Sequence, residues 1–334
     1  MAYQFVLFDR SEGVGLVTLN RPEQLNAFTL QMLEELLNVF KGMERDPEVR
    51  AIILTGAGKA FCGGEDFKAR AQQETQAFES APAPVAPPAY SYNPQPIVPP
   101  LPVTNPDYTP LNPGPPPSFQ RSEPQDPFAP VYSQNPAPKA PETAVSTRPN
   151  SMHDLIRRSY SPLLLQIRRI RKPVIAAING VAAGTGFGLA LACDVRYASD
   201  NARFLEVSTR VGLMPGGGLA YLLPRLIGTS RAMELAFAGE EMTAGEARDL
   251  GLVSKVVTPE SLLDEARKLA LRLAKGPTRS IGLTKALMNE SSQLSFEQAL
   301  NMEAQLMEES SRTQDYREGL KAFLEKRAPN FKGS

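Results

Sequence analysis

The sequence predicts an α/β domain with a helical C-terminal layer, interrupted by a long proline-rich insertion. Short apolar runs typical of buried strands alternate with amphipathic segments up to residue 257, and only helical patterns follow. Of the 31 prolines, 22 lie between Pro82 and Pro149. We therefore expect a core formed by residues 1–70 and 151–257, an insertion over 71–150, and a helical region over 258–334.

The first core segment is predicted to run strand, strand, helix, strand. Apolar runs at 5–8 and 15–19 are split by the turn-like Ser11-Glu12-Gly13. Leucines and Phe40 recur at helical spacing over 29–43, which predicts an amphipathic helix. The uninterrupted apolar run at 51–54 predicts a strand that is buried on both faces.

The second core segment continues the alternation. We expect a helix from Met152 with Ser151 as its cap, a strand at 174–178 after Pro173, and a small-residue helix that starts at Leu189. Further strands are expected at 194–198 and 252–257. Capping boxes are predicted for Thr243 with Glu246 and for Asp315 with Glu318. Helices are then expected over 259–275, 296–307 and 316–327.

The insertion carries almost no aliphatic clusters, so it cannot bury enough apolar surface to offset the entropy of ordering it. We expect residues 71–150 to be disordered and partly polyproline II. Pro-x-x-P arrangements at 84–87 and 113–116 suit SH3- or WW-like partner domains. An inert linker is the simpler interpretation of the same residues.

Composition excludes several classes of function. The formal net charge is zero, which favours neither nucleic acid nor an anionic membrane as a partner. No apolar run reaches the roughly 20 residues that span a bilayer. The two cysteines lack metal-ligand spacing and are too few for a disulfide framework, so we expect reduced thiols in the cytoplasm. A secretory signal is not expected before the strand-like residues 5–8.

Two glycine-containing segments carry the chemistry. Gly63-Gly64 and Gly184-Thr185-Gly186-Phe187-Gly188 each follow a strand-like run and lead toward a helix. Such turns leave backbone N–H groups that can bind an anion, and two of them aimed at one point can stabilise an oxyanion. The alternative interpretation is that these glycines only allow a strand and a helix to pack closely. Dinucleotide binding is disfavoured because Leu189 stands where that motif needs glycine or alanine.

Other catalytic arrangements lack support. His153 is the single histidine and lies at the edge of the insertion, and no Gly-x-Ser-x-Gly elbow is present. The arginines over 157–171 are most simply a solvated helix face, with phosphate binding as the alternative. No cluster has metal-ligand spacing.

Several motifs occur in a fixed order along both core segments. They are Leu19-Asn20-Arg21-Pro22 with Asn26-Ala27; the stretch from Thr55 to Gly64; the stretch from Lys172 to Gly180; Ala192-Cys193-Asp194; Gly251-Leu252-Val253; and Asp315-Tyr316-Arg317-Glu318-Gly319 with Phe323-Leu324-Glu325-Lys326-Arg327. With these motifs the chain resembles the crotonase (enoyl-CoA hydratase/isomerase) superfamily. The last of them, together with Leu222-Leu223-Pro224-Arg225, is most similar to the ring-epoxide isomerase branch of that superfamily.

This resemblance implies a spiral of ββα turns with a helical trimerisation layer, a homotrimer or hexamer, and a CoA thioester as substrate with no separate cofactor. It implies that the two loops meet at the thioester carbonyl, with the backbone amides of Glu65 and Thr185 as donors. The CoA moiety would contact residues in two regions of the chain. These residues are Arg21, Ala27, Gly63 and Lys68, and, from a neighbouring subunit, Phe323 and Lys326.

The chain departs from the family at its acid/base positions. Gly188 and Ser208 stand where hydratases carry glutamates, and Gly216 stands where the ring-epoxide isomerase branch carries aspartate. Without a positioned proton acceptor, roughly 10²–10⁴-fold of rate is lost. The substitutes that we consider are Glu65, beside its own amide, and Glu206, which would share a strand face with Ser208. Ser208 can orient water but cannot deprotonate carbon unaided.

We therefore expect an acyl-CoA enzyme of this family, with double-bond isomerisation favoured because it needs one proton shuttle and no pair of groups to hold water. The alternatives are a hydratase-like lyase with a non-standard acid/base, and a non-catalytic CoA-binding or scaffold protein.

Overall fold

The computed structural model describes residues 3–67 and 152–334, which belong to one compact unit. The predicted insertion at 71–150, its Pro-x-x-P arrangements, Lys68 and the predicted cap Ser151 lie outside the described residues. No helix in the described part is long and apolar enough to cross a membrane.

A six-stranded sheet with the order β1-β2-β3-β5-β7-β10 forms the centre of the fold. The β1–β2 hairpin is antiparallel and every other pairing is parallel. All six residues of β3 are buried, which confirms the prediction of a strand covered on both faces. The strands are β1 (Val6–Ser11), β2 (Val14–Leu19), β3 (Ala51–Gly56), β5 (Val174–Ile178), β7 (Val195–Ser199) and β10 (Lys255–Val257).

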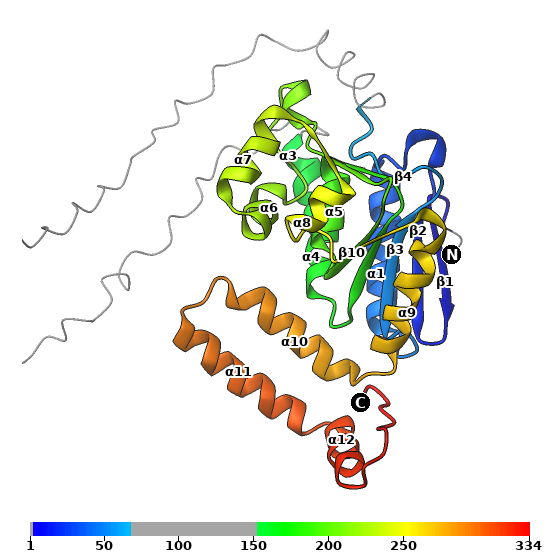
Figure 1. The fold of residues 1–334 in the computed structure, drawn as a ribbon, viewed down its shortest axis with the longest axis vertical. Helices are drawn as coiled ribbons and strands as arrows, with labels where there is room; N and C mark the ends of the chain where they lie inside the picture. Colours follow the sequence, from blue (N-terminus) through cyan, green and yellow to red (C-terminus); the bar gives the residue numbers. More distant parts are fainter. Residues whose placement is uncertain (1–2, 68–151) are drawn as a thin grey trace, which may run out of the picture. The chain divides into compact units, whose positions relative to one another are not determined.

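Helices cover both faces of this sheet, and the alternation of strand side chains decides which face each residue serves. Ala51 and Ile53 of β3 pack beneath α9, whereas Ile52 and Leu54 belong to the larger core on the opposite face. The helix α9 (Leu262–Ala274) lies along the first face of the sheet (Figure 1). It presents a stripe of leucine and alanine side chains to that face. Helices α1 (Leu30–Arg45), α4 (Ser161–Arg169) and α5 (Thr185–Ala192) contribute to the larger core.

A second sheet has the order β4-β6-β8-β9. Strands β3, β5 and β7 are neighbours in the first sheet, and the strands that follow them in the chain, β4, β6 and β8, are neighbours in the second. Each ββα turn therefore adds one strand to each sheet, which confirms the predicted spiral. The strands are β4 (Ala60–Cys62), β6 (Val181–Ala183), β8 (Arg203–Leu205) and β9 (Glu241–Thr243).

The remaining helices include α8, which contacts β8 and β9 of the second sheet, and a C-terminal layer in which α10 packs on α11. The short turn Ile156–Tyr160 is a π-helix between α3 and α4. The helices are α3 (Met152–Leu155), η2 (Ile156–Tyr160), α6 (Leu219–Ile227), α7 (Thr229–Ala238), α8 (Ala244–Asp249), α10 (Thr278–Ser291), α11 (Phe296–Ser311) and α12 (Gln314–Leu324), with 3₁₀ turns η1 (Pro22–Gln24), η3 (Ser208–Val211) and η4 (Pro259–Ser261).

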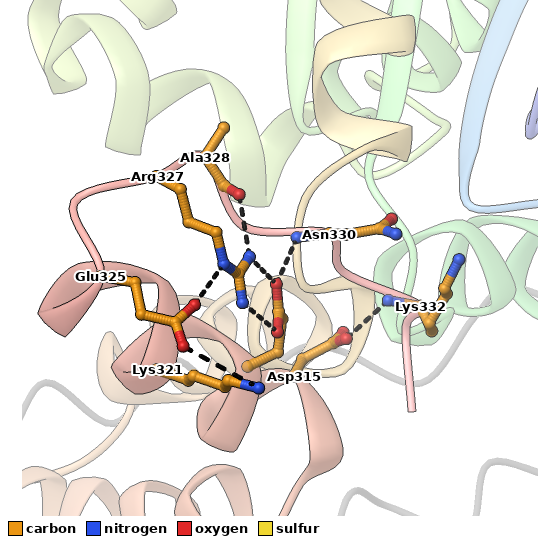
Figure 2. A network of polar contacts seen from close by, with 8 residues as sticks. Asp315, Lys321, Glu325, Arg327, Ala328, Asn330 and Lys332 are labelled. Atoms are coloured by element: carbon orange, nitrogen blue, oxygen red, sulfur yellow. Dashed lines mark hydrogen bonds and ion pairs between the residues drawn. The ribbon is translucent and has the colours of Figure 1, made fainter.

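The chain end folds back on α12 through polar contacts (Figure 2). The Arg327 guanidinium donates to both carboxylate oxygens of Glu318, at 2.6 Å and 3.0 Å, and to Glu325 at 2.6 Å. Asp315 accepts hydrogen bonds from the backbone N–H groups of Lys332 at 2.6 Å and of Gly333 at 2.7 Å. These contacts hold the last ten residues against the helix.

Two local predictions need correction. The small-residue helix begins at Thr185, inside the second glycine segment, and not at Leu189. The final helix is capped by Thr313, whose hydroxyl accepts from the Tyr316 N–H at 3.0 Å, so the predicted capping box of Asp315 is wrong. The box formed by Thr243 and Glu246 is confirmed.

Candidate active site

The first glycine segment turns at Gly64, whose φ of +87° lies in the left-handed region that glycine tolerates. The Phe28 N–H donates to Gly64 O at 2.7 Å, and the Asp66 N–H donates to Phe28 O at 3.4 Å. This parallel bridge uses the Gly64 carbonyl and the Asp66 N–H, which are the backbone groups on either side of Glu65. The Glu65 N–H therefore points to the opposite side of the segment, away from Phe28.

The second glycine segment turns at Gly184, which has a φ of +49° and precedes α5. Gly184 N–H donates to Leu205 O at 2.9 Å, which fixes the turn to the end of β8. Thr185 is the first residue of α5, and N–H groups in a first helical turn have no acceptor inside the helix. The Thr185 amide is therefore oriented outward at the positive end of the helix.

The two segments lie in backbone contact. A Cβ atom on Gly64 would be 2.6 Å from Ala183 O and 3.4 Å from Thr185 N, and one on Gly186 would be 2.4 Å from Cys62 O. No side chain fits at these distances, so glycine is required at both positions. The amides of Glu65 and Thr185 are consequently carried by segments that meet.

A pocket opens beside this meeting point, and most of its lining is apolar. Its polar side chains among the described residues are Glu65, Tyr160, Thr185 and Ser208. The apolar and glycine positions are Gly63, Phe67, Met152, Ile156, Gly184, Val207, Leu213, Met214, Pro215 and Gly216.

Positions 188, 208 and 216, where the resemblance led us to look for carboxylates, differ in the space around them. A Cβ on Gly188 would lie 2.1 Å from Gly217 O, so the backbone of the 216–218 loop occupies the place of any side chain there. At Gly216 a Cβ would meet only Thr185 Cγ2, at 3.3 Å. Ser208 lines the pocket and is buried.

Glu206 does not line the pocket. Strand β8 ends at Leu205, so the condition for Glu206 and Ser208 to share a strand face is not met. One carboxylate oxygen, Oε1, accepts from the Ser208 N–H at 2.7 Å. The other, Oε2, is buried and has no hydrogen-bond partner among the described residues.

The predicted CoA-contacting residues fall into two groups. Arg21 donates to Ala27 O at 2.5 Å and to Asp66 at 3.1 Å, beside the first glycine segment, and Gly63 lines the pocket. Phe323 is 80% exposed at the end of α12, close in sequence to Lys326, and neither residue lines the pocket.

Neither cysteine is suited to nucleophilic chemistry. Burial raises the pKa of both thiols to about 12, and Cys62 donates to Asn26 O at 3.2 Å. No group of three His, Cys, Asp or Glu side chains in the described residues is arranged to hold a metal ion.

The sequence did not point to Tyr160, Phe67, Met152 and Ile156 as pocket residues. Tyr160 is buried with its ring 5.6 Å from that of Phe28, in an edge-on arrangement. The π-helical turn that holds Ile156 and Tyr160 is a feature often found at functional sites, but no local sequence signal predicts it.

Comparisons with known proteins identify the family of the chain. The family model for enoyl-CoA hydratase/isomerase matches residues 9–86 and 143–334. The chain is 32% identical over 330 residues to the 1,2-epoxyphenylacetyl-CoA isomerase of Escherichia coli strain K12, with 99% of each chain covered. It is 29% identical over 336 residues to the crotonyl-CoA hydratase of Syntrophomonas wolfei, again with 99% of each covered.

The fold has a close counterpart among solved structures. An enoyl-CoA hydratase from Bacillus anthracis matches with a TM-score of 0.72 and 29% identity, over 99% of this chain and 100% of that one. The protein is therefore an acyl-CoA enzyme. It belongs to the enoyl-CoA hydratase/isomerase family, whose members act on CoA thioesters without a required cofactor.

Proposed function

We propose that this enzyme is an enoyl-CoA double-bond isomerase. The observation that carries the proposal is the meeting of the Glu65 and Thr185 segments at a pocket whose one lining carboxylate, among the described residues, is that of Glu65. A shift of a double bond needs one group that removes a proton and returns it to another carbon. It needs no second group to hold water.

The reaction would proceed through an enolate. The thioester oxygen accepts hydrogen bonds from the amides of Glu65 and Thr185, which stabilise the negative charge as it develops. The Glu65 carboxylate takes a proton from carbon and returns it at the other end of the allylic system. The apolar lining excludes water, which strengthens these hydrogen bonds and protects the intermediate.

Hydration is disfavoured by the same geometry. The Gly217 backbone fills the space at Gly188, and Ser208 has no ionisable side chain. The loss of a positioned acid/base corresponds to roughly 10²–10⁴-fold in rate. A hydratase-like lyase in which Ser208 orients water beside Glu206 would instead release a 3-hydroxyacyl-CoA, and product analysis separates the two reactions.

The test is turnover of purified protein on 2-enoyl-, 3-enoyl- and ring-substituted acyl-CoAs, followed by chromatography of the products. The variant Glu65→Gln keeps the backbone amide and removes the base, so we expect kcat to fall about 10²–10⁴-fold with little change in binding. Glu34→Gln, on the exposed face of α1, is the matched control. A folded wild-type protein that turns over none of these substrates would refute the proposal.

In that event a non-catalytic CoA-binding or scaffold role becomes the better explanation. The lack of carboxylates at positions 188, 208 and 216 is the observation that favours it. Binding of CoA thioesters without turnover, measured by calorimetry, would support this role.

Several further assignments are part of the proposal. CoA would be held by Arg21, Ala27, Gly63 and Lys68, with Phe323 and Lys326 supplied by a neighbouring subunit. This arrangement requires a homotrimer or hexamer. Helix α11 buries none of its residues, and exposed Phe296, Met288 and Met307 lie on the C-terminal layer. Sedimentation analysis tests the assembly, and a monomer would contradict it.

The remaining assignments concern organisation and location. We propose a core of residues 1–70 and 151–257, a separate insertion and a C-terminal helical region. Deletion of 71–150 tests whether the insertion serves the active site or binds a partner with a domain that recognises proline motifs; a variant unchanged in both respects leaves an inert linker. Two free, buried cysteines are compatible with a cytoplasmic location, which we also propose.

A further inference from the structure

One hydroxyl at the pocket has no role in the fold. Thr185 Oγ1 is buried and has no hydrogen-bond partner among the described residues, although Thr185 lines the pocket. Buried polar side chains in native proteins almost always have a partner, and an exception calls for an explanation. The backbone amide of the same residue already serves the proposed oxyanion site, and that role leaves the hydroxyl unexplained.

The two branches of the Thr185 side chain have different surroundings. The methyl Cγ2 lies 3.3 Å from the position of a Cβ on Gly216, which also lines the pocket. No other described atom lies within 4 Å of that position, apart from the immediate chain neighbours of Gly216. The hydroxyl, by contrast, is covered by protein. The structure thus places the methyl beside an open glycine, and the hydroxyl where no described residue accepts a hydrogen bond from it.

We propose that the Thr185 hydroxyl donates a hydrogen bond to the oxygen of the bound thioester, as a third donor beside the amides of Glu65 and Thr185. A rotation of about 120° about χ1 carries the hydroxyl to the position that the methyl occupies, and the methyl to the position of the Cβ hydrogen. The glycine at position 216 leaves space beside the position that the hydroxyl then takes. The rotation brings the donor to the pocket and leaves no polar group in the place where the hydroxyl had no partner.

The hydroxyl should act mainly on the enolate form of the bound thioester, which carries the negative charge. A hydrogen bond to an enolate oxygen is stronger than one to a neutral carbonyl, so the hydroxyl stabilises the enolate more than the ground state. This inference rests on the proposed function. It predicts that the fraction of enolate in a bound 3-oxoacyl-CoA depends on the hydroxyl, whether or not isomerisation is measured.

The experiment compares Thr185→Val, which keeps the shape and removes the donor, with Thr185→Ser, which keeps the donor and removes the methyl. Thr229→Val, at the exposed start of α7, is the matched control. We expect Thr185→Val to lose about 10- to 100-fold in kcat/KM and in the ratio of enolate to keto form of bound 3-oxoacyl-CoA, read from near-ultraviolet absorbance. Its melting temperature should not fall, because the substitution removes an unpaired buried donor.

Thr185→Ser should recover most of both losses. If Thr185→Val retains the wild-type kcat/KM and enolate absorbance, the inference is wrong. If Thr185→Val does not fold, Thr185→Ala replaces it in the comparison with Thr185→Ser. A wild-type protein that enolises the 3-oxoacyl-CoA but isomerises nothing would refute the isomerase proposal, and the enolate ratio would still decide the role of the hydroxyl. A wild-type protein that does not bind the ligand would overturn both.

Discussion

A buried ion pair fastens α10 to the core, and its removal should destabilise the protein strongly. Lys285 Nζ lies 2.8 Å from Asp194 Oδ2 and donates to the carbonyls of Ile167 at 2.8 Å and Lys172 at 3.2 Å. Only 7% of the Lys285 side chain is exposed. Asp194 also accepts from the Val174 N–H at 2.8 Å. Burial lowers the pKa of Lys285 and raises that of Asp194, while their mutual attraction opposes both shifts.

The substitution Lys285→Met would leave the Asp194 carboxylate buried with the Val174 amide, and two carbonyls would lose their donor. Truncating one partner of a buried pair costs about 3–5 kcal/mol. In Asp194→Asn the amide oxygen can still accept from Val174, and Lys285 keeps its two carbonyl acceptors. We expect a smaller loss, about 2 kcal/mol. The double variant should be more stable than the sum of the two losses predicts, by about 2 kcal/mol.

Urea denaturation of the four proteins measures these differences as changes in the free energy of unfolding at constant m-value. Arg312→Gln is the matched control, since its ion pair with Glu308 is exposed on α11 and should be worth less than about 1 kcal/mol. If the two single losses were additive, or if Lys285→Met were no worse than the control, the buried pair would not be the attachment that we describe.

Three further outcomes follow from the structure. The substitution Gly188→Glu should lower the free energy of unfolding by about 1–3 kcal/mol or abolish folding, because its side chain overlaps the Gly217 backbone. The substitution Gly216→Asp should fold, and it should raise kcat for isomerisation about tenfold or more if proton transfer limits the rate. Urea unfolding and kinetics check both variants, and a Gly188→Glu variant as stable as the wild type would contradict the overlap. Neither cysteine should react with iodoacetamide at pH 8 in the native protein, because burial raises each thiol pKa to about 12; mass spectrometry detects any adduct. The hydrogen bond from Arg327 lowers the pKa of Glu318 to about 2. The contribution of a carboxylate with a lowered folded-state pKa is present above its unfolded value and lost as the pH falls through the folded one, so slow hydrogen exchange of the Asn330 amide should persist at pH 4 and disappear toward pH 2.

The apolar pattern of the sequence predicts most of the sheet, because a strand buried on both faces must be apolar throughout. The strand at Val174–Ile178 was predicted with its observed boundaries, and Ala51–Gly56 within two residues. Helix α1 was predicted from its own pattern, because one face of the helix is buried and its cap, Thr29, is the residue just before it. These elements are specified by residues within a few positions of one another.

Elements that depend on distant contacts were not predicted. Asp315 and Glu318 have the spacing of a capping box, but their carboxylates bind the tail more than ten residues away. Helix α6 was missed, since it follows three glycines and contains Pro224. Helix α10 was missed as well; it buries a lysine, Lys285, which interrupts the apolar pattern that marks a core-facing helix.

The meeting of the two glycine segments could be anticipated, but the reason for the missing carboxylate at position 188 could not. That reason is a backbone contact with Gly217, 29 residues later in the chain. Gly217 itself has a φ of +63°, and a Cβ built on it would lie 2.8 Å from Thr185 Cα, so no side chain fits there either. Loop and helix therefore approach each other as bare backbone. A single substitution at 188 cannot restore a carboxylate while that loop remains in place. We propose that the acid/base group of this chain comes from the other wall of the pocket, where Glu65 follows the first glycine segment.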